Sequence, residues 1–364
     1  MDGELTHRVT TRPEFAWHEV SGAIGDAVTV VPIVVAVAVL TELSLSMMLL
    51  WFGAFQVVWG LYYGAPVSVE PMKALAALVI GGSLSTGELV VAGLSLAALL
   101  LLVGTTGTLG VVERYVGEPV VRGIQFGVAL VLLETGVDLA VVDLSLAAVA
   151  AVVAVCTVAV GYRTSSAFAV FLVGATVALV RGGVPAPALP PVDAMMLLPA
   201  ADVTVGAFKA TAAQLAMTVG NAALATAILL GDYFDRDVSA DQLSTSMGAM
   251  NAVAVPLGGF PMCHGSGGVA GKYAFGARTP GANVVLGVGY VLVALLAVGL
   301  VSAYPTAVLG VILLLIAAQL GYTGLSKTDD YLLAVGVGVL GVLVNLGVAL
   351  LAGVLVHQTR AYVR

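Results

Sequence analysis

The stretch "GAPVSVEPMK", residues 64–73, lies between two apolar segments that are each long enough to form a membrane helix. It contains two prolines, a glutamate and a lysine. Pro66 and Pro71 push the residues before them toward extended backbone, and a proline suits the first position of a helix. We therefore expect residues 65–69 to be extended and a short helix to start near Glu70.

A second stretch of the same kind, "GGFPMCHGSGG", occupies residues 258–268. We expect Pro261 to break the chain, residues 262–264 to be extended and another short helix to begin near Gly265. Extended backbone is tolerated at membrane depth only where it is paired or lines a cavity. The two extended segments are therefore expected to pair with each other.

The apolar spans that contain these short helices, 69–82 and 265–277, are shorter than the others. Helices of this length measure about 20 Å. The hydrocarbon core of a bilayer is about 30 Å thick, so neither helix can cross it alone. Both are expected to be half-helices.

The composition is that of a polytopic all-α membrane protein. The chain has 364 residues, of which 60% are hydrophobic and 10% charged, whereas soluble domains have about 25% charged residues. The polar tail at residues 1–18 has no apolar core and does not resemble a signal peptide. The net charge of −7 is spread over the loops, so no nucleic-acid partner is expected. Since no metal-ligand spacing and no nucleophile–base motif occurs, we expect no cofactor, no metal and no enzyme activity.

The apolar runs predict about fourteen membrane elements. The candidate spans are 19–40, 43–63, 69–82, 87–110, 118–135, 138–160, 164–182, 205–230, 240–258, 265–277, 281–301, 303–323 and the block 331–357. The last block is predicted to be a two-helix hairpin that turns near Asn345. This hairpin places Arg360 and Arg364 on the same side as most other basic residues, as the positive-inside rule requires. We therefore expect a multi-pass plasma-membrane protein with both termini in the cytoplasm.

An internal repeat supports this count. At an offset of 195 residues, Gly25–Asp26 aligns with Gly220–Asn221, and Pro66 aligns with Pro261. Each copy would hold seven elements, so the second copy enters the membrane upside down, as in many secondary transporters. The expected division is a tail at 1–18, a first repeat at 19–182, a connector at 183–204 and a second repeat at 205–358.

The two half-helices would point their N-termini at a common site. A helix N-terminus carries roughly +0.5 charge and free N–H donors, which together favour an anion. Lys73 would add a full positive charge, Ser266 a hydroxyl donor, and the glycines close access to the backbone. The candidate binding residues at the two starts are Glu70, Pro71, Met72, Lys73, His264, Gly265, Ser266, Gly267 and Gly268.

Other interpretations of these residues stay open. Glycines also permit close helix packing, and a lysine can reach an interface from inside a membrane. For His264 a hydrogen-bonded core position is preferred over a ligand role. The energetic demand is also large, since stripping an ion of water costs on the order of 20 kcal/mol in the idealised limit. One helix terminus returns at most about 2 kcal/mol, so several features must act together.

Polar residues inside other spans extend the candidate site. Intramembrane ionisable groups are functional candidates by default. Asp26 and Asn221 are repeat mates that could face one cavity, and Gln125 lies early in the fifth span. Further candidates are Gln56, Gln214 and Asn251, whereas Glu134 is expected to be solvated and Arg122 to mark the inner interface.

Several stretches resemble the molybdate-transporter branch of the sulfate permease superfamily. They are "PLGGFPMCHGSGGVAGKYAFGAR" (256–278), "PVSVEPMKALAA" (66–77) and "AAQLAMTVGNAALATAILLGDYF" (212–234). The resemblance covers almost the whole chain and implies the fold shared with uracil permeases. It implies a core domain of residues 19–110 and 205–301, a gate domain of residues 118–182 and 303–358, and a substrate site between the third and tenth elements. Glu70 stands where the family has glutamine, and Lys272 where a neutral residue is expected.

The resemblance implies uptake of molybdate, or of a related oxyanion such as sulfate or tungstate. We expect a secondary transporter that works by alternating access, with Glu70 or Asp26 as the candidate proton carrier. The expected partners are this oxyanion and the lipid bilayer, and a homodimer stays open. The alternatives are a nucleobase or organic-anion transporter of the same fold and an anion channel.

Overall fold

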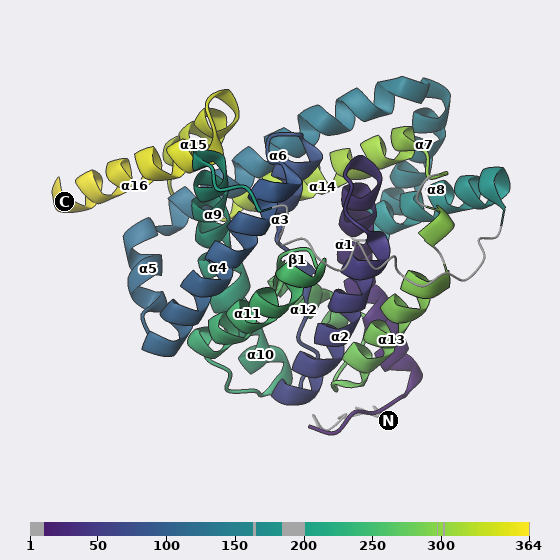
Figure 1. The fold of residues 1–364 in the computed structure, drawn as a ribbon, viewed down its shortest axis with the longest axis horizontal. Helices are drawn as coiled ribbons and strands as arrows, with labels where there is room; N and C mark the ends of the chain where they lie inside the picture. Colours follow the sequence, from purple (N-terminus) through teal and green to yellow (C-terminus); the bar gives the residue numbers. More distant parts are fainter. Residues whose placement is uncertain (1–10, 163–164, 184–200, 297, 301–302, 364) are drawn as a thin grey trace.

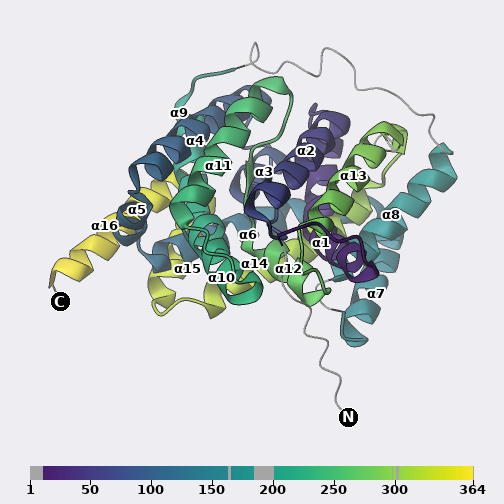
Figure 2. The same ribbon diagram turned by 90° about the horizontal axis from the view of Figure 1, so that it is seen from below.

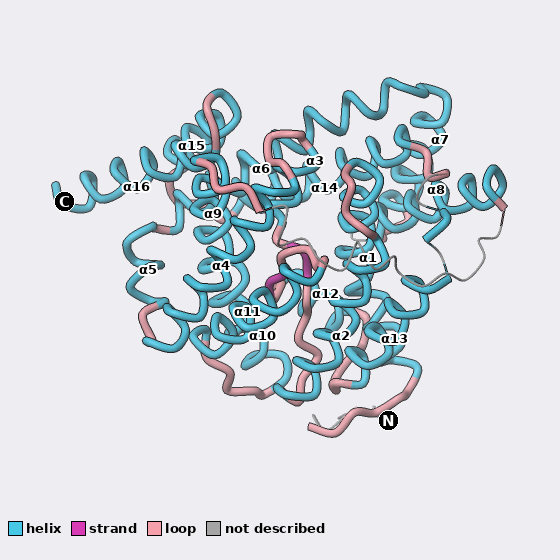
Figure 3. Tube along the Cα trace, in the orientation of Figure 1, coloured by secondary structure: helices cyan, strands magenta, loops and turns pink. Residues whose placement is uncertain are grey.

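The computed structural model describes residues 11–162, 165–183, 201–296, 298–300 and 303–363, and helices dominate it (Figure 3). The first half of the chain forms α1 (Trp17–Leu40), α2 (Leu45–Tyr63), β1 (Glu70–Pro71), α3 (Lys73–Ile80), α4 (Thr86–Thr106), α5 (Leu109–Val116), α6 (Glu118–Ala140), η1 (Val141–Asp143), α7 (Leu144–Ala159) and α8 (Ser166–Gly182). The second half forms α9 (Val205–Met217), η5 (Thr218–Leu224), α10 (Ala225–Phe234), α11 (Ala240–Ala254), η6 (Val255–Leu257), β2 (Met262–Cys263), α12 (Ser266–Ala274), α13 (Gly281–Leu296), η7 (Val298–Leu300), α14 (Thr306–Ser326), α15 (Tyr331–Leu343) and α16 (Leu346–Val363).

The predicted spans agree with these helices to within a few residues. Among the described residues, six helical stretches are long and apolar enough to cross a membrane. The last apolar block is a hairpin as predicted. Its first helix, α15, ends at Leu343, and α16 starts at Leu346 and packs against α15. Most of the predicted connector, residues 184–200, lies outside the described residues.

Helices from the two halves of the chain pack against each other in two groups. In one group α4 packs on α11, α2 on α13, and α1 on α12; in the other, α14 packs on α6 and α8, and α15 on α6. Figure 1 shows α6, α14 and α15 in the upper part of the molecule, with α2, α11 and α13 below them, and Figure 2 shows the same helices from below. The cross-half pairs are those that an inverted repeat produces.

The two breaks meet at the centre of the molecule. β1 and β2 pair antiparallel, with Glu70 opposite Cys263 and Pro71 opposite Met262, and these strands are magenta in Figure 3. The predicted pairing is therefore confirmed. The expected start of the first half-helix was wrong by three residues, since α3 begins at Lys73. Pairing across the strands and a bond from the Met72 N–H to the Pro261 carbonyl (2.9 Å) keep the backbone extended past Pro71.

Side chains from neighbouring helices complete the hydrogen bonding of this extended backbone. The Asn251 amide in α11 donates to the Met262 carbonyl and accepts from the Met262 N–H, both at 2.7 Å. On the other half, α12 begins at Ser266 after the N-cap Gly265, as predicted. The second break is thus held on one edge by β1 and on the other by an asparagine.

Paired glycines bring the core helices close together. A Cβ on Gly25 would lie 2.7 Å from the Gly271 carbonyl oxygen, and one on Gly271 would lie 2.8 Å from the Gly25 carbonyl oxygen. The same reciprocal contact joins Gly53 of α2 to Gly287 of α13. Small residues permit this approach in membrane helix pairs. As a result Asp26, next to Gly25, reaches the start of α12.

The glycine contact between α2 and α13 predicts a difference between two neighbouring positions. A Cβ at Gly287 would lie 2.6 Å from both the Gly53 oxygen and the Val57 side chain, whereas Gly289 has nothing within 4 Å. Gly287→Val should therefore reduce the free energy of unfolding by about 1–3 kcal/mol through overpacking. Gly289→Val is the matched control and should leave it nearly unchanged. Thermal midpoints of the purified variants test this, and equal midpoints would contradict the packing.

Candidate functional site

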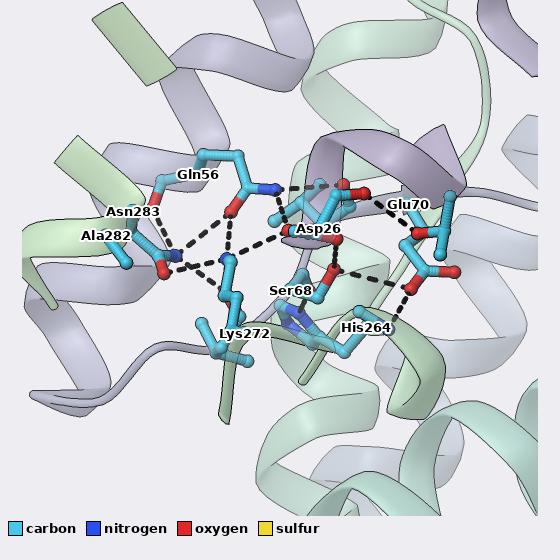
Figure 4. A network of polar contacts seen from close by, with 12 residues as sticks. Asp26, Gln56, Ser68, Glu70, His264, Lys272, Ala282 and Asn283 are labelled. Atoms are coloured by element: carbon cyan, nitrogen blue, oxygen red, sulfur yellow. Dashed lines mark hydrogen bonds and ion pairs between the residues drawn. The ribbon is translucent and has the colours of Figure 1, made fainter. Parts of the chain in front are cut away.

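The Glu70 carboxylate lies where the two half-helix starts converge. Its Oε2 atom is 2.7 Å from the Lys73 ammonium, and its Oε1 atom accepts the Gly268 backbone N–H at 2.6 Å. Glu70 is buried, while the Lys73 side chain is 28% exposed. The Glu70 carboxylate of the protein itself therefore pairs with the lysine and the helix N-terminus that the sequence predicts for an anion. Figure 4 shows Glu70 together with Ser68 and Asp26 in the surrounding polar network.

Glycines make this contact possible. A Cβ at Gly265 would overlap the Glu70 carboxylate, and one at Gly268 would overlap the Asp26 carboxylate, the Ser68 hydroxyl and Glu70. Gly267 is different, because it is exposed and its nearest neighbour would be 3.9 Å away. Ser266 beside it is half-buried. The α12 start thus has a closed side that faces the carboxylates and a more open side at Gly267.

Asp26 belongs to the same network. Its carboxylate accepts from the Ser68 hydroxyl at 2.7 Å and from the Gln56 amide at 2.9 Å, and it pairs with Lys272 at 2.9 Å. The Ser68 hydroxyl also lies 3.5 Å from Glu70 Oε1, which links the two ion pairs. Lys73, Glu70, Asp26 and Lys272 together carry no net charge.

Lys272 and Gln56 are the residues whose role the sequence did not assign. In the sequence, Lys272 stands out only as a departure from the family pattern, and Gln56 is a further candidate with no assigned partner. The structure buries both completely and joins them by a bond of 3.0 Å between the ammonium and the Gln56 amide oxygen. Their polarity inside apolar spans was the signal that could have found them.

His264 is a hydrogen-bonded core residue. Its Nδ1 atom lies 2.9 Å from the Ser68 carbonyl oxygen and its Nε2 atom 2.7 Å from the Ser246 hydroxyl. Since a carbonyl can only accept, Nδ1 carries the proton and Nε2 accepts from the serine. The Tyr63 hydroxyl is in turn 2.8 Å from Ser246. Both ring nitrogens are thus engaged in positioning the strand, which agrees with the preferred interpretation from the sequence.

The start of α3 is covered by a side chain from α9. The Gln214 amide oxygen accepts the N–H groups of Ala74 (2.9 Å) and Leu75 (3.3 Å), and its amide nitrogen donates to Thr218. Met72, the N-cap of α3, is buried. The first free donors of this half-helix are therefore satisfied within the protein.

Asn221 and Gln125 lie in a separate cluster. Asn221 accepts from the Arg122 guanidinium at 2.8 Å and donates to the Gln125 amide oxygen at 3.4 Å. It lies in η5, a π-helical turn that interrupts the helix aligned with α1. Among the described residues, Asn221 and its repeat mate Asp26 have different hydrogen-bond partners. Arg122 bridges α6 to η5 and also pairs with Glu118.

Lys73 borders a small cavity between the two groups of helices. One wall is formed by α3 and by Ile33 of α1. The facing wall is apolar and consists of Leu132 of α6 with Leu313, Ile316 and Leu320 of α14. The exposed part of the site therefore opens toward α6 and α14. Among the described residues no group of His, Cys, Asp and Glu side chains is arranged to hold a metal.

Solved structures with a similar fold are anion transporters by title. The transmembrane domain of the cyanobacterial bicarbonate transporter BicA superposes with a TM-score of 0.68 at 16% identity and covers 94% of this chain and 100% of that one. The murine anion transporter Slc26a9 in an inward-facing state gives 0.69 at 13% identity and covers 96% of this chain and 69% of that one. These likenesses confirm the predicted fold.

Sequence comparisons identify the family. Molybdate transporter 2 of Arabidopsis thaliana is 29% identical, covering 87% of this chain and 81% of that protein. Molybdate transporter 1 of Chlamydomonas reinhardtii is 24% identical, covering 94% and 91%. The family model described as "Molybdate transporter of MFS superfamily" matches residues 18–132 and 206–320, one stretch in each half. The chain therefore belongs to this molybdate-transporter family.

Proposed function

We propose that this chain is a secondary transporter of a tetrahedral dianion, most simply molybdate, that works by alternating access. The observation that carries the proposal is the Glu70 carboxylate held between Lys73 and the Gly268 N–H. A cation and a helix N-terminus on opposite sides of two carboxylate oxygens form a site that a free oxyanion also fits. The relatives named above as molybdate transporters support the choice of substrate.

In this proposal the substrate replaces the Glu70 carboxylate. An added dianion next to Glu70 would meet a like charge in a buried site, where charges repel more strongly than in water. If Glu70 turns away or takes a proton, Lys73 and the α12 start are released for the substrate. Gly267 is exposed, and Lys73 borders a small cavity that faces α6 and α14, so widening of that cavity would admit the proposed substrate.

Proton coupling follows from the same competition. Protonated Glu70 loses its ion pair with Lys73, so a proton and the oxyanion would bind together. The other titratable groups near Glu70 are Lys73, Asp26, Lys272, Cys263 and Tyr290. Asp26 is the poorer carrier, because Lys272, Gln56 and Ser68 all hold its carboxylate deep in the core.

The proposed moving parts are the two groups of helices. The core comprises α1–α4 and α9–α13, and the gate comprises α6–α8 and α14–α16. The contacts between them include the Arg122–Asn221 hydrogen bond and the apolar wall of α6 and α14 facing Lys73. In this proposal the core slides against the gate, because few hydrogen bonds between described residues of the two groups would have to break. The distribution of basic residues supports a plasma-membrane orientation with both termini in the cytoplasm.

Titration of the purified protein with molybdate, sulfate and uracil tests the substrate class. We expect heat of binding from molybdate and none from uracil. A nucleobase transporter would need a carboxylate free for ring N–H groups, and Glu70 is already engaged. Uracil binding that excludes molybdate would overturn the proposal.

Lys73 should be required for affinity. Lys73→Ala removes the cation from the site and leaves Glu70 unpaired at the α12 start, so molybdate binding should weaken at least tenfold, about 1.4 kcal/mol. Isothermal titration measures this, with the exposed Lys327→Ala as the control. Affinity equal to that of the unmodified protein would remove Lys73 from the site.

Glu70 should set the pH dependence. In the unmodified protein molybdate uptake should rise as pH falls, because protonated Glu70 no longer competes for Lys73. Glu70→Gln keeps an acceptor for the Gly268 N–H but has no charge, so it should bind molybdate with a flat pH profile of uptake. The control is Glu134→Gln, at an exposed glutamate of α6. A profile that is unchanged in Glu70→Gln would eliminate this role.

The two neighbouring glycines of α12 should respond differently. Gly268→Ala places a methyl group against Asp26, Ser68 and Glu70, whereas Gly267→Ala places one in open space. We expect molybdate binding to fall by about tenfold or more only in Gly268→Ala. Thermal midpoints of both variants separate loss of binding from unfolding. Equal molybdate binding by the two variants would show that the side of α12 facing Asp26 and Glu70 does not contribute to the site.

A further inference from the structure

The Lys272 ammonium is enclosed by four oxygen atoms. They are Asp26 Oδ2 at 2.9 Å, Gln56 Oε1 at 3.0 Å, the Val67 carbonyl at 2.8 Å and Asn283 Oδ1 at 2.8 Å. All five residues are buried. Figure 4 shows the oxygens converging on the ammonium from several sides. We call these four atoms the oxygen cage.

The number of oxygens exceeds what directed hydrogen bonding needs. A lysine ammonium has three N–H donors, whereas four acceptors lie within 3.0 Å of it. The cage contains one carboxylate, two amide oxygens and one backbone carbonyl, so it carries one negative charge. That charge matches a single monovalent cation, and amide or carbonyl oxygens can replace the hydration shell of such an ion. Divalent ions usually require more charged oxygens.

The cage is held together by contacts that do not involve Lys272. The Asn283 amide nitrogen donates to the Val67 carbonyl at 2.6 Å and to the Gln56 amide oxygen at 3.0 Å. The Gln56 amide nitrogen donates to Asp26 at 2.9 Å and to the Val69 carbonyl at 3.2 Å. These bonds tie α1, α2, the segment before β1 and α13 to one another. The oxygens would therefore stay in place if the lysine were shortened.

We propose that Lys272 is a tethered cation in a built monovalent-cation site. Its ammonium supplies the charge that the cage requires and joins α12 to the other core helices. The unmodified protein therefore needs neither Na⁺ nor K⁺ to complete its core, and shortening Lys272 opens the cage to a free cation. The inference goes beyond the proposed function, because it holds for any substrate.

The test uses four variants in choline chloride at constant ionic strength, with Na⁺, K⁺ or NH₄⁺ replacing choline stepwise. Lys272→Ala should have a thermal midpoint several degrees below that of the unmodified protein, and at least one of the three cations should restore it saturably. Lys272→Met fills the same space with an apolar chain, so its lowered midpoint should not respond. Lys272→Ala combined with Asp26→Asn lacks the cage charge and should not respond either. Lys327→Ala, at an exposed lysine, is the control and should behave as the unmodified protein.

Three results would overturn the inference. One is a Lys272→Ala midpoint that ignores all three cations, and another is failure of this variant to fold in any of the salts while Lys272→Met folds. The third result concerns the unmodified protein. We expect it to take up molybdate equally in Na⁺, K⁺ and choline media. A loss of uptake of about tenfold or more without Na⁺ or K⁺ would contradict a built-in cation. The thermal measurements do not depend on molybdate, so they stand if the proposed substrate is wrong.

Discussion

Backbone that leaves a helix inside a membrane must find hydrogen-bond partners within the protein, and this constraint shapes the centre of the molecule. β1 comes from the first half of the chain and β2 from the second, so each break is satisfied by the other. Asn251 supplies partners for β2, and Gln214 accepts N–H groups in the first turn of α3. Neither half can complete this region alone. The same pairing brings the starts of α3 and α12 to one place, where we propose the binding site.

Charge balance is the second constraint at this place. Glu70, Asp26 and Lys272 are buried, Lys73 is partly exposed beside them, and the formal charges of the two carboxylates and two ammonium groups cancel. A dianion added to this set would leave net charge in a medium of low dielectric, which costs several kcal/mol per ion even after relaxation. Exchange of one anion for another avoids most of that cost. A carrier must change conformation with its site empty. A site that then holds its own carboxylate stays neutral, whereas a site without one would be left positively charged. The first kind is therefore better suited to a carrier.

The sequence predicts the frame of this site better than its interior. Prolines, glycines and apolar runs act locally, so the spans, both breaks and the hairpin near Asn345 could be inferred. The start of α3 at Lys73 could not, because it depends on the bond between Met72 and Pro261, which belong to different halves. The contact of Glu70 with Gly268 joins residues 198 positions apart and leaves no local pattern. Lys272 was visible as an unusual charge, but its partners come from four other segments.

Residues at equivalent positions of the two repeats make different contacts. Gln56 and Asn251 align in the repeat, yet Gln56 holds Asp26 and Lys272 while Asn251 holds the backbone of β2. Asp26 and Asn221 also align, yet one is a charged member of the core and the other a neutral contact to α6 through Arg122. At these two pairs of aligned positions, the only charged side chain is that of Asp26 in α1, whereas Asn221 and Asn251 in the second half are neutral. The ion pairs Lys73–Glu70 and Lys272–Asp26 lie within one group of helices. The proposed movement of that group against α6 and α14 would therefore separate neither ion pair.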